Sequence, residues 1–396
     1  MKKQEKKFVL AALVLLAAIT MVLLPLAGCK NDTVPEPTRY TVKFETAHGT
    51  VPADITVESG NAATKPTDPT KDGWTFLGWY EDSGLTKEFD FSTPVTADIT
   101  LYAKWRANPG TVVSDGLTIG EIKLEKTSEV QVLSEAVDLS SLDVEGSNSE
   151  VFISGRSGTI QPFVMGQYEV TQQLYSAVMG INPSGFTSDV AAEETQKLRP
   201  VEGVSWYDAV VFCNKLSQLM GLEPVYSKGG TTDTSGWGEV PDSINKDWDE
   251  ITCNWNASGY RLPTEAEWEL AARGGNAEVA AWQYTYAGTN EESTLKNYAW
   301  YSGNSDSKTH EVGTMTANRL KLHDMSGNVW EWCWDRWSVS IAAGTPSDGA
   351  VSGSSRVLRG GGWRSNANRC AVSDRGYYGP FNRFNDLGFR LVRSAN

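Results

Sequence analysis

Cysteine and histidine are the residues whose type and spacing could most readily support chemistry in this chain. Beyond Cys29 the cysteines are Cys213, Cys253, Cys333 and Cys370, and the histidines are His48, His310 and His323. The cysteines form no CxxC pair and have no neighbouring pair of histidines, so their spacing fits no zinc site. No Ser–His–Asp order, glycine-rich phosphate loop or paired-carboxylate signature stands out either. The cysteines and histidines therefore give no reason to expect a catalytic site.

Residues 356–392 carry a different kind of chemistry. The segment reads RVLRGGGWRSNANRCAVSDRGYYGPFNRFNDLGFRLV, with strand-like ends and a middle rich in Tyr, Phe, Arg and Asn. Rigid aromatic rings supply contact area, and Arg and Asn supply adaptable hydrogen bonds. Because loops on a rigid scaffold can carry such residues without harming the fold, this composition predicts a recognition surface.

Two sets of residues alternate between 364 and 386. The expected frame consists of Trp363, Ala367, Cys370, Ala371, Val372, Arg375, Pro380, Arg383 and residues 387–390. The expected ligand-binding residues are Arg364, Ser365, Asn366, Asn368, Arg369, Asp374, Tyr377, Tyr378, Phe381, Asn382, Phe384, Asn385 and Asp386. Lys, Glu, Gln, Met and Trp do not occur between 364 and 386, although all five occur elsewhere. An AAC codon randomised at its adenines cannot encode these five, but it can encode every residue of the ligand-binding set. The four aromatic members of that set are expected to be exposed.

The elements that must position this segment are predicted within residues 151–396. Three helices begin at capping residues and end near glycines, at Thr171 and Gly180, at Ser205 and Gly221, and at Thr264 and Gly274. Thr264 and Glu267 have the spacing of a capping box. Few helices, short strands and long aromatic loops predict an irregular α+β domain.

A separate β-rich module is predicted at residues 39–106. The stretches YTVKFET, WTFLGWY and ITLYAKW have the alternation and aromatic content of strands, and turn residues separate them. The frame from Trp74 to Tyr80, with Phe89, Phe91 and 101–105, resembles the Listeria–Bacteroides repeat. That resemblance implies a β-grasp-like spacer or adhesive module without catalysis. Residues 107–150 are expected to be a lead-in or linker with some strand character.

The N-terminus predicts export and lipidation. Four lysines precede an apolar run from Phe8 to Leu24, and LAGC ends at Cys29. This layout is that of a signal peptide spanning residues 1–28, and its end resembles a bacterial lipobox in which Cys29 receives lipid. Residues 29–38 are then a tether. Four cysteines in an exported chain could pair in three ways or stay free, and the sequence leaves this open.

Net charge argues against nucleic acid as a partner. The chain carries −14 at neutral pH, and removing the basic N-terminus makes the remainder more acidic. A strongly acidic protein without a basic stripe repels phosphate backbones.

Six motifs in residues 151–396 occur in one order: MGQYEVTQ (165–172), RPVEGVSWYDAVVFCN (199–214), YRLPTEAEWELAARGG (260–275), DMSGNVWEW (324–332), RVLRGGGW (356–363) and LGFRLV (387–392). Together they resemble the sulfatase-modifying-factor family, whose founder is the formylglycine-generating enzyme. The resemblance implies a C-type-lectin-like fold, but a fold alone does not give a function.

The resemblance also implies which residues would carry the family's oxidase chemistry. The family enzyme binds copper with two cysteines spaced C-x4-C beyond its GGSY/W motif. Aligning GGGW (360–363) puts Ser365 at the first cysteine, and Cys370 falls at the second or at a structural cysteine further along. Because a serine hydroxyl cannot replace a thiolate on Cu(I), neither copper nor oxidase activity is expected. The iron site of other superfamily members, His-x3-His-x-Glu, has no counterpart in three scattered histidines.

A calcium ion is a further implication of the resemblance. In the family enzyme the DMSGNVWEW segment holds calcium, which would here involve the side chains of Asp324 and Glu331 and the carbonyls of Gly327 and Val329. Hard oxygen donors of this kind suit Ca²⁺. The alternative is that the segment's Asn and Trp side chains simply brace the core.

The frame of the C-terminal segment resembles that of variable proteins made by diversity-generating retroelements. These carry the same RGGxW…GFR pattern on the same fold, and the lipid-anchored treponemal branch is the most similar in kind. The resemblance implies a surface-displayed lipoprotein in the cell envelope, with a protein or glycan ligand on another cell surface. Two alternatives stay open: a formylglycine-generating or related oxidoreductase acting on a protein cysteine, and a structural envelope protein with no specific ligand.

Lipidation can be tested by fractionation. Replacing Cys29 with Ala should release the protein from the membrane fraction and change the size of the mature chain, because the acyl anchor is lost. Immunoblots of membrane and soluble fractions check this, and an unchanged membrane-bound protein of unchanged size would contradict the lipoprotein hypothesis.

Overall fold

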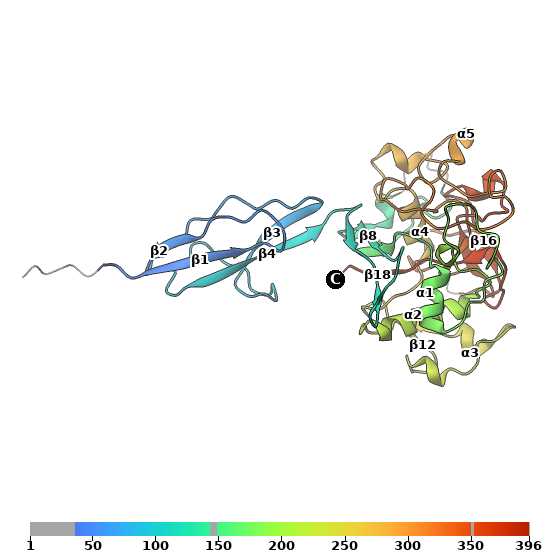
Figure 1. The fold of residues 1–396 in the computed structure, drawn as a ribbon, viewed down its shortest axis with the longest axis horizontal. Helices are drawn as coiled ribbons and strands as arrows, with labels where there is room; N and C mark the ends of the chain where they lie inside the picture. The colour runs from blue at the N-terminus through green and yellow to red at the C-terminus, as the bar shows by residue number, and fades with distance from the viewer. Residues whose placement is uncertain (1–35, 143–148, 350–351, 396) are drawn as a thin grey trace, which may run out of the picture.

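The computed structural model describes residues 36–142, 149–349 and 352–395. The predicted signal peptide, Cys29 and most of the tether lie outside the described residues. Within the described ranges, no helix is long and apolar enough to cross a membrane. The chain forms an N-terminal strand module and a larger main domain that follows it (Figure 1).

The N-terminal module is a mixed four-stranded sheet. Its strands are β1 (Arg39–Glu45), β2 (Ile55–Glu58), β3 (Trp74–Tyr80) and β4 (Ile99–Ala107), in the order β2-β1-β4-β3. The central strands β1 and β4 run parallel, and both outer strands pair antiparallel. Alternation in β1 buries Val42 and Phe44 and exposes Lys43. Phe44 meets Trp79 edge to face at 4.7 Å, so the predicted aromatic strands build this core.

The expected lead-in contributes a central strand to the main domain. β8 (Glu129–Leu133) lies in the sheet β18-β11-β8-β5, with β5 (Val112–Ser114), β11 (Phe163–Gly166) and β18 (Val392–Ser394). All five residues of β8 are buried. Its polar members are paired, because Arg393 donates to Glu129 at 2.7 and 2.8 Å and Gln131 donates to the Leu133 carbonyl. The polar residues Glu129 and Gln131 therefore lie in a buried strand, and part of 107–150 belongs to the folded main domain.

The three predicted helices are confirmed. They are α1 (Gln172–Met179), α2 (Trp206–Leu219) and α4 (Glu265–Ala272). The Thr171 side chain caps α1, and Gly180 follows its last turn with φ of 76°. Capping boxes start α2, between Ser205 and Asp208, and α4, between Thr264 and Glu267.

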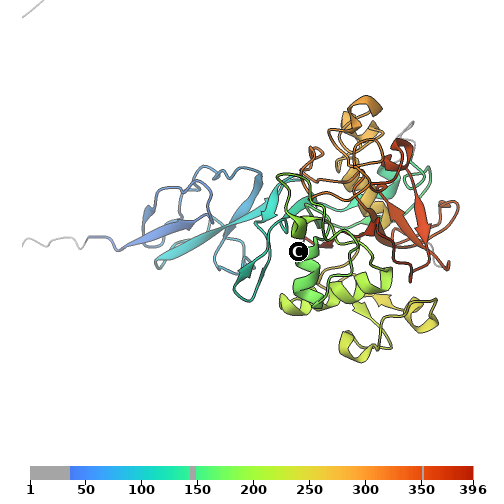
Figure 2. The ribbon, with the colours of Figure 1, turned by 45° about the vertical axis from the view of Figure 1, so that its right-hand side comes forward.

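A second sheet in the main domain carries the C-terminal segment. Its order is β16-β15-β14-β17, formed by β14 (Trp330–Arg336), β15 (Arg356–Arg359), β16 (Gly376–Tyr378) and β17 (Leu387–Gly388). Side chains alternate between its faces, so Trp332 and Leu358 pack in one cluster with α2, and Cys333 and Val357 pack in another with α4. Figures 1 and 2 show β16 on the side of the main domain turned away from the N-terminal module.

Short elements complete the domain. They are β6 (Thr118–Ile119), β7 (Ile122–Lys123), β9 (Val137–Asp138), β10 (Thr159–Ile160), β12 (Tyr226–Ser227), β13 (Thr252–Cys253), α3 (Lys246–Asp249), α5 (Glu292–Leu295) and 3₁₀ turns at Leu139–Ser141, Gln196–Leu198, Thr234–Gly236, Ala280–Gln283 and Ala367–Cys370. Long loops join them, as expected for an irregular α+β domain. Cys213, Cys253, Cys333 and Cys370 are free thiols in this structure.

Buried arginine–carboxylate pairs tie the C-terminal segment to the rest of the domain. Arg390 donates to both oxygens of Glu331 at 2.7–3.1 Å, and both side chains are fully buried. Burial alone would lower the pKa of Arg390, but Glu331, with Glu169 and Asp324, raises that pKa above its ordinary value. The guanidinium therefore stays charged, and its charge is matched inside the core.

Two more pairs anchor the segment to α4. Arg375 holds Glu265 with two hydrogen bonds of 2.6 and 2.8 Å. Arg359 pairs with Glu269, and both are fully buried. The C-terminal segment is therefore fixed from beneath by buried ion pairs to β14 and α4.

Replacing Arg390 with Met should lower the free energy of unfolding by about 3–5 kcal/mol, because Glu331 would be left as an unpaired buried charge. Urea denaturation of the variant measures this loss. The matched control is Lys197→Met, which removes an exposed ion pair with Glu125 and should cost less than about 1 kcal/mol. Equal losses in the two variants would contradict a structural role for the buried pair.

Candidate functional site

The predicted ligand-binding residues lie on and around β16 and the loops that flank it. Eight of them are exposed: Arg364, Asn366, Asn368, Arg369, Tyr377, Tyr378, Phe384 and Asn385. Asp374, Phe381 and Asn382 are half-buried. Phe381 packs against the cluster that contains α2, which differs from the exposure expected for it.

Two predicted ligand-binding residues are buried, and their contacts are internal. The Ser365 hydroxyl accepts a hydrogen bond from the Gly362 N–H at 3.0 Å. The Asp386 carboxylate accepts two hydrogen bonds from Arg364, at 2.5 and 2.9 Å. Both polar groups are satisfied within the fold, so neither is placed to contact a ligand in this structure. The Arg364–Asp386 pair joins the two ends of the 364–386 segment.

Most of the predicted frame is buried. Ala367, Cys370 and Ala371 join a small cluster with Tyr286 and Leu295. Val372, Arg375, Pro380 and residues 387–390 are buried, whereas Trp363 and Arg383 are half-buried. The frame and ligand-binding sets therefore differ in exposure, with Ser365 and Asp386 as the exceptions.

Glycine is required where the segment turns away from β15. Gly361 has φ of 74°, and a Cβ there would lie 2.7 Å from the Arg369 carbonyl oxygen. A side chain would thus meet both backbone strain and a clash with the 3₁₀ turn. The glycines of RGGGW allow this close approach, which sets the position of the exposed residues that follow.

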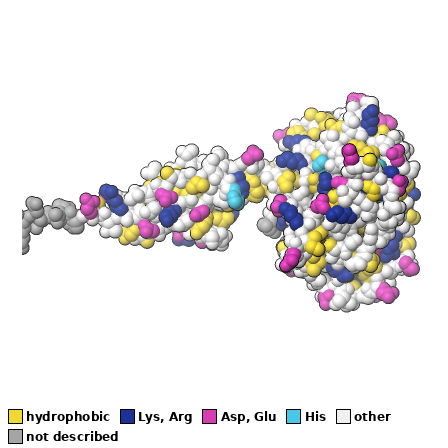
Figure 3. All heavy atoms as spheres, viewed as in Figure 1, with side chains coloured by type: hydrophobic (Ala, Val, Ile, Leu, Met, Phe, Trp, Pro, Cys, Tyr) yellow, Lys and Arg dark blue, Asp and Glu magenta, His cyan; other side chains and the backbone are white. Residues whose placement is uncertain are grey.

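Aromatic side chains dominate the exposed surface around β16. Tyr377 stacks on Trp337 at 4.6 Å between ring centroids, and Tyr378 lies 4.7 Å from Phe384. The neighbouring charges are paired, because Arg369 contacts Asp374 at 3.2 Å and Arg364 contacts Asp386. Elsewhere, on the face shown in Figure 3, acidic and basic side chains are interspersed. The β16 region is thus an aromatic surface with little unpaired charge.

The copper-type chemistry of an oxidase finds little support here. Cys370 is buried, and burial raises the pKa of its thiol to about 12. It is therefore a protonated thiol at neutral pH, and it packs among alanines and aromatics like a structural cysteine. Its partner position holds Ser365, whose hydroxyl is used within the fold. These two residues do not fit a Cu(I) ion, which prefers thiolates.

Both predicted side-chain ligands of calcium already make hydrogen bonds within the fold. Glu331 is occupied by Arg390 and by the Trp268 Nε1–H at 2.7 Å. Asp324 accepts from the Gly313 N–H with one oxygen, and its other oxygen has no hydrogen-bond partner in the structure. Across the described ranges, no group of three or more His, Cys, Asp or Glu residues could hold a metal ion.

The backbone predicted to bind calcium is also buried. Val329 is fully buried, and its N–H donates to Glu169, an acid that lies with Asp324, Glu331 and Arg390. Burial, reinforced by Asp324 and Glu331, raises the pKa of Glu169 well above its ordinary value. Gly327 turns with φ of 89° and donates its N–H to the Gly360 carbonyl. The bracing role expected as the alternative agrees with these contacts, whereas calcium binding itself is not tested by them.

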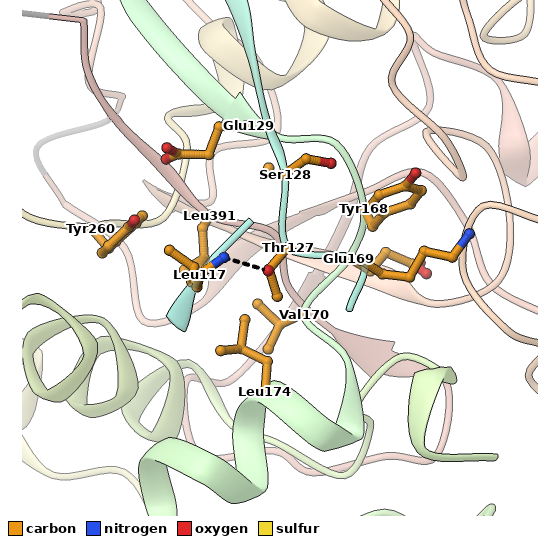
Figure 4. A pocket seen from close by; sticks show the side chains of 12 residues that line it. Leu117, Thr127, Ser128, Glu129, Tyr168, Glu169, Val170, Leu174, Tyr260 and Leu391 are labelled. Atoms are coloured by element: carbon orange, nitrogen blue, oxygen red, sulfur yellow. Dashed lines mark hydrogen bonds between the residues drawn. The ribbon is translucent and has the colours of Figure 1, made fainter. Parts of the chain in front are cut away.

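Five cavities of the described chain lie away from residues 364–386. Their volumes run from about 20 to 440 Å³, and none of these five is lined by a residue between 364 and 386. The smallest lies between Tyr168, Glu169, Val170 and Leu174 on one side and Leu117 and Thr127 on the other (Figure 4). Its volume of about 20 Å³ suits one water molecule and excludes an organic ligand.

The sequence of the main domain matches a known family. Residues 134–395 match the sulfatase-modifying factor enzyme 1-like domain, and residues 40–104 match the Listeria-Bacteroides repeat domain. The chain therefore belongs to the sulfatase-modifying factor enzyme 1-like family, with a Listeria-Bacteroides repeat preceding that domain.

Relatives of the main domain include a named enzyme and proteins that are not named as enzymes. Treponema denticola variable protein 1, a solved structure, is 42% identical with a TM-score of 0.63, and the match covers 72% of this chain and 99% of that one. Chaperone protein LppX of Paenibacillus barcinonensis is 38% identical over 259 residues, which cover 61% of this chain and 83% of LppX. The formylglycine-generating enzyme of Streptomyces coelicolor is 28% identical over 268 residues, covering 60% of this chain and 80% of the enzyme. The family thus includes proteins that are not named as enzymes.

Sequence reasoning missed the residues that support the surface. Glu265, Glu267 and Glu269 are all buried in α4, and each pairs with a buried arginine. The available signal was an eight-residue helix with three glutamates and no basic residue. Trp337 offered no such signal, because its stacking on Tyr377 joins segments 40 positions apart.

Calcium should have little effect on stability if Glu331 remains paired with Arg390. We expect melting temperatures within about 1 °C of each other in millimolar calcium and in EGTA. A site held at 100 times its Kd would add about 2.7 kcal/mol, which corresponds to a rise of roughly 5–10 °C for a domain of this size. Differential scanning calorimetry makes the comparison. A rise of that size that Asp324→Asn abolishes would instead establish a bound ion.

Proposed function

We propose that this protein is a surface-displayed lipoprotein of the cell envelope that binds a ligand through a diversified C-terminal surface. The exposed residues between 364 and 386 contact the ligand, which is a protein or glycan on another cell surface. The frame residues of the same segment keep the surface in place while the exposed residues change.

The observation that carries this proposal is the difference in exposure between the two sets. The thirteen predicted ligand-binding residues form the contact set, and eight of them are exposed. The frame is mostly buried and is held by Arg359, Arg375 and Arg390. Every member of the contact set belongs to the residue types that a randomised AAC codon encodes. Loops that vary on a rigid scaffold are a physically stable way to change recognition.

Similarity and geometry support display at a surface. Treponema denticola variable protein 1 is 42% identical to this chain, and the LAGC stretch ending at Cys29 has the layout of a lipid attachment site. In sequence, the N-terminal module stands between the predicted anchor and the main domain. In the structure, β16 lies on the side of the main domain turned away from that module (Figure 1). An anchored chain would therefore present the contact residues away from the membrane.

Deep sequencing of this gene in a population of the source cells tests the diversification. We expect substitutions to gather at the codons of the thirteen predicted ligand-binding residues and to be rare at frame codons such as those of Cys370, Arg375 and Arg390. Diversification by adenine-directed mutagenesis also predicts a reverse-transcriptase gene nearby, with a near-copy of the segment that has adenines at the variable positions. If the segment has the same sequence throughout the population and no such copy exists, the surface is fixed and the proposal is wrong. The codons of 172–179, which encode α1, serve as the internal control.

A further inference from the structure

Trp337 lies outside the proposed variable segment but is part of the same surface. It follows β14 directly, and its N–H donates to the Ser355 carbonyl. Its ring stacks on Tyr377 with an interplanar angle of 24°. The Arg375 guanidinium lies over the Trp337 ring, 4.5 Å from the ring centroid. The cation–π contact with Arg375, a frame residue, therefore holds the Trp337 ring, and in this sequence the ring also stacks on Tyr377.

The contact that holds Trp337 is itself anchored in the core. Arg375 is buried and is fixed by two hydrogen bonds to Glu265 on α4. Arg375 also donates to the Ser338 carbonyl at 3.1 Å, which fixes the backbone between Trp337 and Val339. Because ordering a flexible side chain weakens binding, a ring held in place before contact is a favourable anchor.

Val339, two residues beyond Trp337 in the chain, presents an exposed aliphatic side chain. It is 85% exposed, the highest value among the large hydrophobic residues that are exposed in the described chain. Tyr377, which stacks on Trp337, is 53% exposed. Single exposed apolar residues are ordinary, but here exposed Tyr377 stacks on Trp337, and exposed Val339 follows Trp337 two residues later in the chain. Trp337 itself is half-buried, and part of its ring packs against the cluster that contains α4.

The shape and charge of this surface limit the kinds of partner that it can bind. β16 is an edge strand, and successive side chains point to opposite faces, so Tyr377 leans toward Trp337 and Tyr378 leans toward Phe384. The two aromatic pairs therefore straddle a strand edge, and none of the five cavities described above opens among them. Small ligands favour concave sites, whereas the cores of protein interfaces are enriched in aromatic residues and depleted of charged ones.

We propose that Trp337 and Val339 form a constant apolar anchor next to the variable residues, an inference that rests on the proposed function. The partner is a folded protein with an uncharged apolar patch. The anchor contributes the same contact in every variant of the surface. The variable residues then choose among proteins that share such a patch, and the class of partner stays the same while its identity changes.

A display experiment can test this anchor. The full chain is displayed on yeast with NNC codons at the seven exposed contact positions other than Arg364, which is kept because it pairs with the buried Asp386. The library is selected in parallel on streptavidin and on the glycan mannan. Streptavidin serves as the folded-protein probe. Selected binders then receive Trp337→Ala, Val339→Ser or the control Val51→Ser, which changes an exposed valine of the N-terminal module. Melting temperatures of all variants report on folding.

We expect streptavidin binders from several sequences, and most should lose at least about tenfold in affinity with Trp337→Ala, the loss typical of a hot spot. Val339→Ser should weaken the same clones by several-fold without lowering the melting temperature, and Val51→Ser should leave binding unchanged. Protein binders indifferent to both Trp337→Ala and Val339→Ser would overturn the anchor alone. Selection of mannan binders only would overturn the choice of a protein partner. Failure to select binders on either probe would count against the proposed function itself.

Discussion

Buried arginine–carboxylate pairs are the constraint on which the C-terminal half of the main domain depends. Arg359, Arg375 and Arg390 come from the segment that forms the surface, and Glu265, Glu269 and Glu331 come from α4 and β14 beneath it. Each partner would be costly to bury alone, so the pairs form only when the segment is in register with the scaffold. Their value lies in specifying position, since an apolar contact would tolerate small shifts that a buried ion pair does not.

This anchoring explains how a segment with little regular structure can present an ordered surface. Between β15 and β17 the chain has only a 3₁₀ turn and the three-residue strand β16. Glycine turns bring the backbone close to the core, and the buried cysteine and alanines fill the space below. Exposed side chains in such a segment contribute little to the core, which separates the stability of the domain from the chemistry of its surface.

The sequence predicted the local elements well because their signals are local. Thr171, Ser205 and Thr264 cap the helices that they predicted, and alternation in β1 places Val42 and Phe44 in the core. β8 was harder to recognise, because its polar residues acquire partners only through pairing with distant strands.

The candidate site was predictable in outline. Composition and the ordered motifs led to the 364–386 segment and its division into two sets. The burial of Asp386 and Ser365 could not be read from residue type, since it depends on contacts made inside the folded loop. The calcium prediction rested on family resemblance, which cannot show that Glu331 is already paired with Arg390. The role of Trp337 likewise depends on contacts between segments far apart in sequence.

The Arg364–Asp386 pair has a consequence for how many sequences the segment can encode. Asp386 is buried and satisfied by a guanidinium that reaches it from 22 residues away. Under independent randomisation, many combinations would bury the aspartate without its partner, or place a bulky side chain where the aspartate fits. If the segment is diversified as proposed, the number of sequences that fold is therefore smaller than the product of choices at each position. Folded variants should show statistical dependence between these two ends, with small neutral residues together or opposite charges together.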